Sequence, residues 1–450
     1  GLREFGPGDR ARNVALLERA VAEDPAFALG WAALANARRA RYQHGDTHLE
    51  EAMTGAQEAI DRALALDPDL VEALVVQCFI KTNQWRTAEA LGPSRRAYEL
   101  APNDPRAVGV RANVLGYLGR PRESLALRQR AVELNPLWWG PVWTMSTDYL
   151  MLGDRERALA QIAAARRMVG GETDAGVFGA RLELAFGQPA QALLRFQQGV
   201  PSGLSYSIIL RTVEVQALAT IGQVEQAEAL LDSLEVRLPE VPAYVDARLT
   251  LLWAAGRFEE ALAWLEGDGR NAAMEPWQTV ARAHARALAG DVDGALADYA
   301  SALEGPTDRH LVFHNWWPTR FGPASLANWI ALSKQSGREY RAEIDDLTAR
   351  LDEAMANGTR APTIFYYRAV LAALRDDPAS ADAALTEARE HGWFDPVALQ
   401  VDIAWRPYRE SAWFEAQRRW LEDKAARERA ILAAGTPGDG ASAAAGPPGA

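Results

Sequence analysis

One short phrase recurs along this chain about every 34 residues. It consists of an apolar residue, a glycine, a few mostly polar residues and then a small residue, as in Leu152-Gly153-Asp154 followed by Ala158. The glycines of six successive phrases lie at positions 119, 153, 187, 222, 256 and 290. A period this regular indicates that one structural unit is repeated and stacked, because a unit of this length cannot bury its own apolar face.

Each unit has the pattern of two short helices joined by a turn. Apolar residues at helical spacings, such as Leu125, Ala131 and Leu134, are typical of an amphipathic helix. Glycine permits the sharp turn between paired helices because it adopts backbone angles that other residues avoid. A small residue five places later lets the two helices approach closely. Prolines at 68, 102 and 136 are also 34 apart and suit the break between units.

This period and this helix–turn–helix unit are those of the tetratricopeptide repeat. The predicted fold is therefore all-α, a right-handed α-solenoid of such repeats. We expect the array to cover residues 10–394 as about ten helical pairs, with insertions near 41–50 and 307–323. Residues 395–432 are expected to form a C-terminal capping helical segment. Residues 433–450 are mostly Gly, Ala and Pro and are expected to be a disordered tail.

Composition excludes several classes of function. The chain has 48 Lys and Arg against 60 Asp and Glu, a net charge of −12. Nucleic-acid binders normally carry a basic surplus, so no nucleic-acid partner is expected. The sequence contains no run of about 18 apolar residues, so it does not predict a membrane span. The one cysteine, Cys78, cannot form an intrachain disulfide or a multi-cysteine metal site. We expect a buried structural thiol and a cytoplasmic rather than periplasmic protein.

Several stretches carry a family resemblance. Residues 17–25 (LERAVAEDP), 26–35 (AFALGWAALA) and 63–74 (ALALDPDLVEAL) resemble bacterial tetratricopeptide regions. Together they look like the C-terminal regions of bacterial signalling proteins with a winged-helix, adenylate-cyclase or serine/threonine-kinase domain upstream. The closing Gly392-Trp393 and Trp405-Arg406-Pro407 are similar to the ends of such regions. The resemblance covers most of residues 10–420 and implies a helical repeat array that holds partners.

No catalytic residue, cofactor or metal site is expected, and the chain is predicted not to be an enzyme. No Gly-x-x-x-x-Gly-Lys phosphate loop is present. His310 and His314 are four residues apart, as are His44 and His48, a spacing that on a helix can chelate a metal. Leu311 follows His310 where a zinc protease requires Glu, so solvated loop histidines are the simpler interpretation.

Stacked helix pairs create a concave surface, and in such arrays the first helix of each unit lines it. Counting back from each turn residue gives the inward positions, among them Thr147, Asp246 and Thr250. Aromatic side chains and arginine are over-represented where proteins grip partners. With two tryptophans added from the longer insertion, the candidate partner-binding residues are Phe79, Asn113, Tyr117, Trp143, Arg181, Gln216, Trp253, Trp277, His284, Trp316 and Trp317.

The leading hypothesis is a protein–protein interaction scaffold or sensory module that binds a peptide or protein partner in the concave groove of a bacterial signalling protein. Two alternatives remain open. The chain is a small-molecule sensor whose Trp316–Trp317 insertion closes a pocket, or it is the non-catalytic region of an enzyme whose catalytic domain lies upstream. The sequence does not identify the partner or the oligomeric state.

Overall fold

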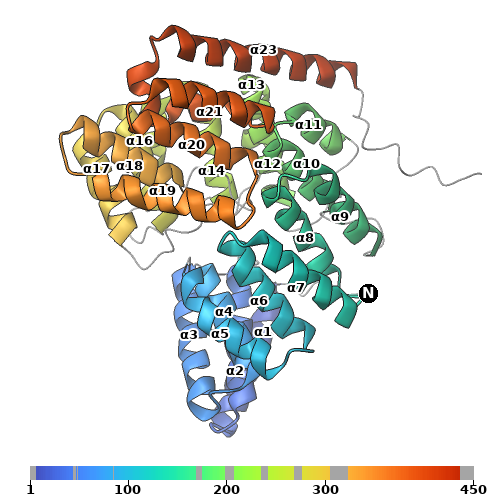
Figure 1. Ribbon diagram of the computed structural model, residues 1–450. Coiled ribbons are helices and arrows are strands. Elements are labelled where there is room, and N and C mark those ends of the chain that lie inside the picture. Colours follow the sequence, from blue (N-terminus) through green and yellow to red (C-terminus); the bar gives the residue numbers. More distant parts are fainter. Residues whose placement is uncertain are drawn as a thin grey trace, which may run out of the picture. The chain divides into compact units, whose positions relative to one another are not determined.

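The computed structural model describes residues 7–43, 47, 49–84, 86–168, 175–197, 207–234, 242–267, 276–304 and 323–435. All regular structure in these ranges is helical (Figure 1), which confirms the predicted all-α array of helix–turn–helix pairs. The described residues form two compact units, one up to Pro141 and one from Val142 onward. None of the described helices is both long and apolar enough to cross a membrane.

The first unit starts with a single helix, α1, which packs on the first of three helix pairs. Its elements are α1 (Pro7–Glu23), α2 (Ala28–Gln43), α3 (Leu49–Leu66), α4 (Val71–Asn83), η1 (Thr87–Ala90), α5 (Leu91–Leu100), α6 (Pro105–Tyr117) and α7 (Pro121–Leu134). Its core includes Cys78, which is fully buried as expected, and burial raises the pKa of this thiol to about 12.

The second unit contains seven further pairs in chain order, α8 to α21, followed by three C-terminal elements. The first helices of the pairs are α8 (Trp139–Met151), α10 (Ala175–Ala185), α12 (Ser207–Thr220), α14 (Pro242–Ala254), α16 (Pro276–Ala289), α18 (Pro323–Gln335) and α20 (Pro362–Leu374). The second helices are α9 (Arg155–Met168), α11 (Pro189–Gln197), α13 (Val224–Asp232), α15 (Phe258–Glu266), α17 (Val292–Glu304), α19 (Arg341–Ala356) and α21 (Pro378–Glu390). The remaining elements are α22 (Pro396–Val401), η3 (Ile403–Tyr408) and α23 (Ala412–Ala434).

The repeated glycine ends the first helix of a pair, and its own backbone takes the left-handed conformation. Gly153 has φ +75°, and its N–H donates to the carbonyl of Leu150 at 2.9 Å. The N–H of Asp154 donates to Tyr149 at 2.8 Å, which completes the pattern in which the last carbonyls of a helix are satisfied by the two residues beyond it. The small residue that follows, Ala158, is fully buried because the paired helices cross there.

The turns of the early pairs in the second unit contact segments near its end. The N–H of Arg360 donates to the carbonyl of Met151 at 2.6 Å. Gly187 lies against the backbone of Gly392, and Arg429 Nη1 donates to the carbonyl of Ile221. Each contact joins residues about six repeats apart, so the stack of pairs in this unit curves back onto itself.

The segment after α21 then packs against first helices of four pairs. The N–H of Ile403 donates to Asn328 Oδ1 of α18 at 2.8 Å, and Arg406 donates to the carbonyl of Ala287 in α16 at 2.7 Å. The indole N–H of Trp405 donates to the hydroxyl of Tyr366 in α20 at 3.0 Å, and α22 contacts α14. Trp405 is fully buried. Residues 395–411, the inner segment, therefore fill the inner face of α14 to α20.

Helix α23 contacts both an early and a late pair of this curved stack. Figure 1 shows it as one long helix that spans from α21 to α11. Gln417 donates to Asp382 of α21 at 2.6 Å. The carboxylate of Glu428 accepts the N–H of Ala190 in the first turn of α11 at 3.0 Å and pairs with Lys424 at 3.0 Å. A carboxylate is favourable at a helix N-terminus, where backbone N–H groups lack partners.

The closure contact at Gly187 can be tested by comparing two glycines in equivalent turns. Gly187→Ala and Gly256→Ala both place a side chain at positive φ, which costs about 1–2 kcal/mol. A Cβ at Gly187 would also clash with the backbone of Gly392 and lie 2.9 Å from Phe394 Cβ, whereas one at Gly256 meets nothing within 4 Å. We expect Gly187→Ala to lower the free energy of unfolding by about 1–3 kcal/mol more than Gly256→Ala in urea denaturation. Equal losses of unfolding free energy in the two variants would contradict the close contact between Gly187 and Gly392.

Candidate functional site

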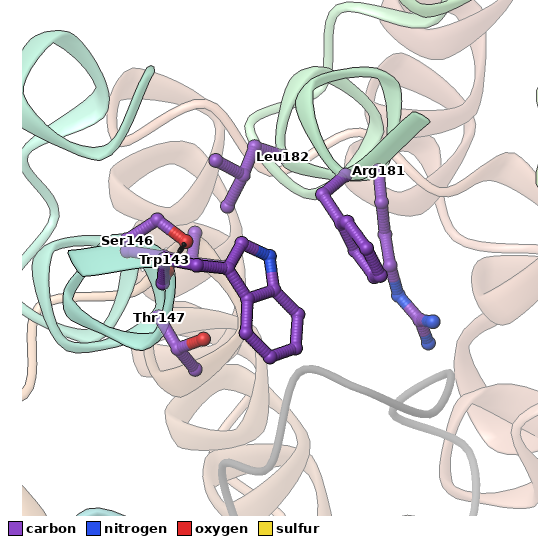
Figure 2. A pocket seen from close by; sticks show the side chains of 7 residues that line it. Trp143, Ser146, Thr147, Arg181 and Leu182 are labelled. Carbon is purple, nitrogen blue, oxygen red and sulfur yellow. Dashed lines mark hydrogen bonds between the residues drawn. The ribbon is translucent and has the colours of Figure 1, made fainter. Parts of the chain in front are cut away.

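A pocket in the second unit is formed by the facing sides of α8 and α10. It is a small pocket that opens to solvent, and it is lined by Trp143, Ser146, Thr147, Leu150, Phe178, Arg181 and Leu182. Figure 2 shows the indole of Trp143 directed toward the helix that carries Arg181. The rings of Trp143 and Phe178 are 4.7 Å apart and inclined by 60°, a favourable tilted pair. Two predicted site residues, Trp143 and Arg181, are thus brought together.

The spacing of these residues along their helices determines where their side chains lie. Trp143 and Leu150 are seven residues apart on α8, and Phe178 and Leu182 are four apart on α10, so each pair lies on one face of its helix. Ser146 is buried, and its hydroxyl donates to the carbonyl of Trp143 at 2.6 Å. The polar group nearest the indole is therefore engaged with the backbone of α8, and the pocket walls are mainly apolar.

Arg181 brings a cationic group into this apolar pocket. Burial lowers the pKa of its guanidinium to about 10, while the charge of Asp246 acts in the opposite direction. The group stays protonated at neutral pH. Within the described part of the chain Arg181 makes no hydrogen bond and no ion pair. The nearby acid of the same helix, the buried Glu183, pairs instead with Arg155 at 2.6 Å and Arg195 at 2.8 Å.

The next two candidate positions lie deeper. Gln216 of α12 donates its amide to Asp246 of α14, and Asp246 is buried. Thr250, one turn further along α14, is also buried. These residues extend the row of polar groups beyond Arg181, but they are engaged with each other or covered by neighbouring helices.

Trp253 and His284 are placed in the interior of the unit. Trp253 is 2% exposed and His284 7%, and their rings are 5.0 Å apart. Nδ1 of His284 lies 3.1 Å from the hydroxyl of Tyr299 and 3.0 Å from the amide nitrogen of Asn328. Because Asn328 in turn accepts the N–H of Ile403, this network connects directly to the inner segment. Both side chains are therefore packed in the interior rather than on an open surface.

Three candidates belong to the first unit, and their surroundings include an arginine that sequence reasoning missed. The guanidinium of Arg39 lies 5.0 Å from the ring centre of Phe79, within cation–π range, and burial lowers its pKa to about 10. Asn113 accepts from Arg128 at 2.7 Å, and burial raises the pKa of Tyr117. Arg39 is 7% exposed and bonds Asn36 at 3.0 Å, so this cluster is closed rather than open.

The remaining candidates lie outside what the structure describes. Trp277 belongs to α16, but its side chain is not described, and Trp316 and Trp317 fall outside the described residues. The same holds for His310, His314 and the pair His44 and His48. Among the residues that are described, no group of three or more His, Cys, Asp or Glu side chains is arranged to hold a metal ion.

Sequence reasoning also missed Phe178 and the inner segment. Phe178 is three residues before Arg181, so the helical spacing alone places both on one face of α10. The inner segment lacks the 34-residue repeat phrase, and we expected residues 395–432 to cap the array.

Comparison with protein-family models gives no match, and no curated protein matches. Among solved structures, a tetratricopeptide repeat protein from Parabacteroides merdae is 15% identical, with a TM-score of 0.32 over 61% of this chain and 92% of that one. The human IFIT1 dimer with PPP-AAAA is 13% identical, with a TM-score of 0.37 over 85% of this chain and 87% of that one. Both scores are below 0.5, and neither likeness bears on what this chain binds.

One hydroxyl group forms two hydrogen bonds with the inner segment, and this contact can be tested. The hydroxyl of Tyr366 donates to Asp402 and accepts from Trp405, and burial followed by the charge of Asp402 raises its pKa well above the usual value. Tyr366→Phe removes one hydrogen bond from each of two buried partners and should lower the free energy of unfolding by about 2 kcal/mol or more. Tyr340→Phe, at a half-buried tyrosine of the same unit, should change it by less than about 0.5 kcal/mol. The two variants are compared by urea denaturation. Equal midpoints would contradict the role of the Tyr366 hydroxyl in holding the inner segment.

Proposed function

We propose that this chain is a protein-interaction scaffold that holds a short segment of a protein partner at the α8–α10 pocket. The observation that carries the proposal is the open pocket in which a tryptophan, a phenylalanine and an arginine from two successive first helices face the same space. Tryptophan and arginine are the residues most enriched among those that dominate binding energy at interfaces.

The position of the pocket in the array supports this function. The inner face of α14 to α20 is filled by residues 395–411, which shows that first helices of this array bind a folded-back segment of chain. The pocket lined by α8 and α10 opens to solvent. A partner segment bound there would use the kind of surface that holds the chain's own segment further along.

The cellular setting follows from the sequence resemblance. We propose that the array serves as the partner-binding or sensory part of a bacterial signalling protein in the cytoplasm, without catalytic activity of its own. The net charge of −12 disfavours a nucleic-acid partner. The alternative of a small-molecule sensor built around Trp316 and Trp317 depends on residues outside the described part of the chain, so the described geometry gives it no support.

The proposal is tested by panning a displayed library of random peptides on the full chain. Enriched peptides should lose affinity about thirtyfold on Trp143→Ala, since a central aromatic anchor contributes about 2 kcal/mol. Trp139→Ala is the matched control, because Trp139 lies on the same helix, is 40% exposed and is not part of the pocket. It should bind like wild type. If no peptide is enriched whose binding depends on Trp143, the pocket is not the partner site.

A further inference from the structure

One side chain links the buried histidine of α16 to the inner segment. Nδ1 of His284 lies 3.0 Å from the amide nitrogen of Asn328, and Oδ1 of the same amide accepts the N–H of Ile403 at 2.8 Å. Asn328 and Ile403 are both buried. The hydrogen bond that holds the backbone of the inner segment on α18 is therefore made by the same amide that contacts the imidazole.

The orientation of the Asn328 amide determines where the imidazole carries its proton. Because Oδ1 faces the N–H of Ile403, the end of the amide near His284 is the NH2 group, which can only donate. The hydroxyl of Tyr299 lies 3.1 Å from the same Nδ1, and burial, together with the charge of Asp402, raises the pKa of this hydroxyl well above its usual value. It stays protonated and can also donate. Nδ1 must therefore accept, so His284 is neutral with its proton on Nε2.

The charged side chains from the elements around His284 already bond to one another, to other side chains or to the backbone. They are Arg282 and Arg286 of α16, Glu266 of α15, Asp298 of α17, Asp291 of the turn between them, Asp246 of α14, Lys334 of α18, and Asp402 and Arg406 of the inner segment. Arg282 and Arg286 share Asp298, at 2.7 and 3.0 Å. A proton on His284 would thus add a positive charge to a buried site whose carboxylates already have partners, and this is unfavourable.

A proton on Nδ1 would also remove the acceptor that the Asn328 amide uses. The hydroxyl of Tyr299 can rotate to accept the new N–H, but the NH2 group of Asn328 then faces a ring nitrogen with no lone pair. If the amide turns its oxygen toward the imidazolium instead, its NH2 group faces the N–H of Ile403, and that hydrogen bond is lost. Either way one buried donor loses its acceptor, so protonation of His284 opposes the bond to Ile403.

We propose that His284 is a pH-sensitive switch, which holds the inner segment on α18 at neutral pH and weakens that hold when it takes up a proton. The closed state requires the neutral ring, whereas in an open state the ring can take up a proton as a solvated histidine does, at about pH 6.5. The hold is therefore complete above that pH and is lost progressively as the pH falls below it. Its release would free the inner face of α14 to α20, so the proposal does not depend on a partner at the α8–α10 pocket.

The test is hydrogen exchange of the full chain at pH 7.5 and 5.5, with the protection of each amide expressed relative to its intrinsic exchange rate at that pH. We expect the protection of residues 395–411 in the wild type to fall about tenfold at pH 5.5, because each opening below about pH 6.5 takes up one proton. Asp and Glu side chains stay largely charged over this range. Unchanged protection of residues 395–411, or an equal loss throughout α8 to α13, would overturn the proposal.

Two substitutions remove the switch in different ways. His284→Asn keeps an acceptor oxygen for Asn328 but does not titrate, so the pH effect should shrink to less than about twofold. Asn328→Asp keeps an acceptor for the N–H of Ile403 and gives the imidazolium a carboxylate partner, so its inner segment should also keep its protection at pH 5.5. His391→Asn is the matched control, since His391 is the other histidine among the described residues, is exposed and stacks on Phe365. It should behave like wild type.

The comparison separates a switch from a histidine that only fills space. A lower protection of His284→Asn that is the same at both pH values agrees with the proposal, because the pH dependence is what the switch contributes. If the acid-induced loss persists in His284→Asn or in Asn328→Asp, or disappears in His391→Asn, the proposal is overturned. If one of the two substitutions at the switch prevents folding, the other gives the result by the same measurement.

Discussion

The structure depends on one constraint, which is that a pair of short helices cannot bury its own apolar side. The pairs from α6–α7 to α20–α21 are each closed by a left-handed residue, and in most of them a small buried residue follows, so that two helices approach closely and present an apolar surface to the next pair. Stacking satisfies this requirement for every pair except those at the ends of the stack. In the second unit the ends meet, because turns of the first pairs lie against the segments around Arg360, Gly392 and Arg429. The curvature of the stack is thus used for stability.

The same curvature bears on where the proposed partner would bind. The inner face of α14 to α20 is closed by residues 395–411, whose Trp405 is fully buried and whose backbone is bonded to Asn328. The α8–α10 pocket opens to solvent and contains the pair Trp143–Phe178 together with Arg181. The described surface therefore differs from one part to another, because one part of it is filled by the chain itself.

The fold could be predicted from the sequence, but the accessibility of the candidate residues could not. The 34-residue period determines helix, turn and pairing locally, and even Asp376, which takes φ +58° in place of glycine, lies at a position marked by the repeat phrase. The burial of His284 involves Asn328, 44 positions further along the chain, and Asn328 in turn binds Ile403, 75 positions beyond it. No local pattern reports such a contact.

In the second unit, residues 395–411 fill the inner face of α14 to α20, and partners are proposed to bind at the α8–α10 pocket instead. Hydrogen exchange of the full chain with and without a bound peptide tests this most directly. The account predicts new protection confined to α8 and α10, with residues 395–411 equally slow to exchange in both states. Faster exchange of residues 395–411 on peptide addition, together with protection along α16 to α20, would show that the peptide displaces the inner segment and would contradict the account.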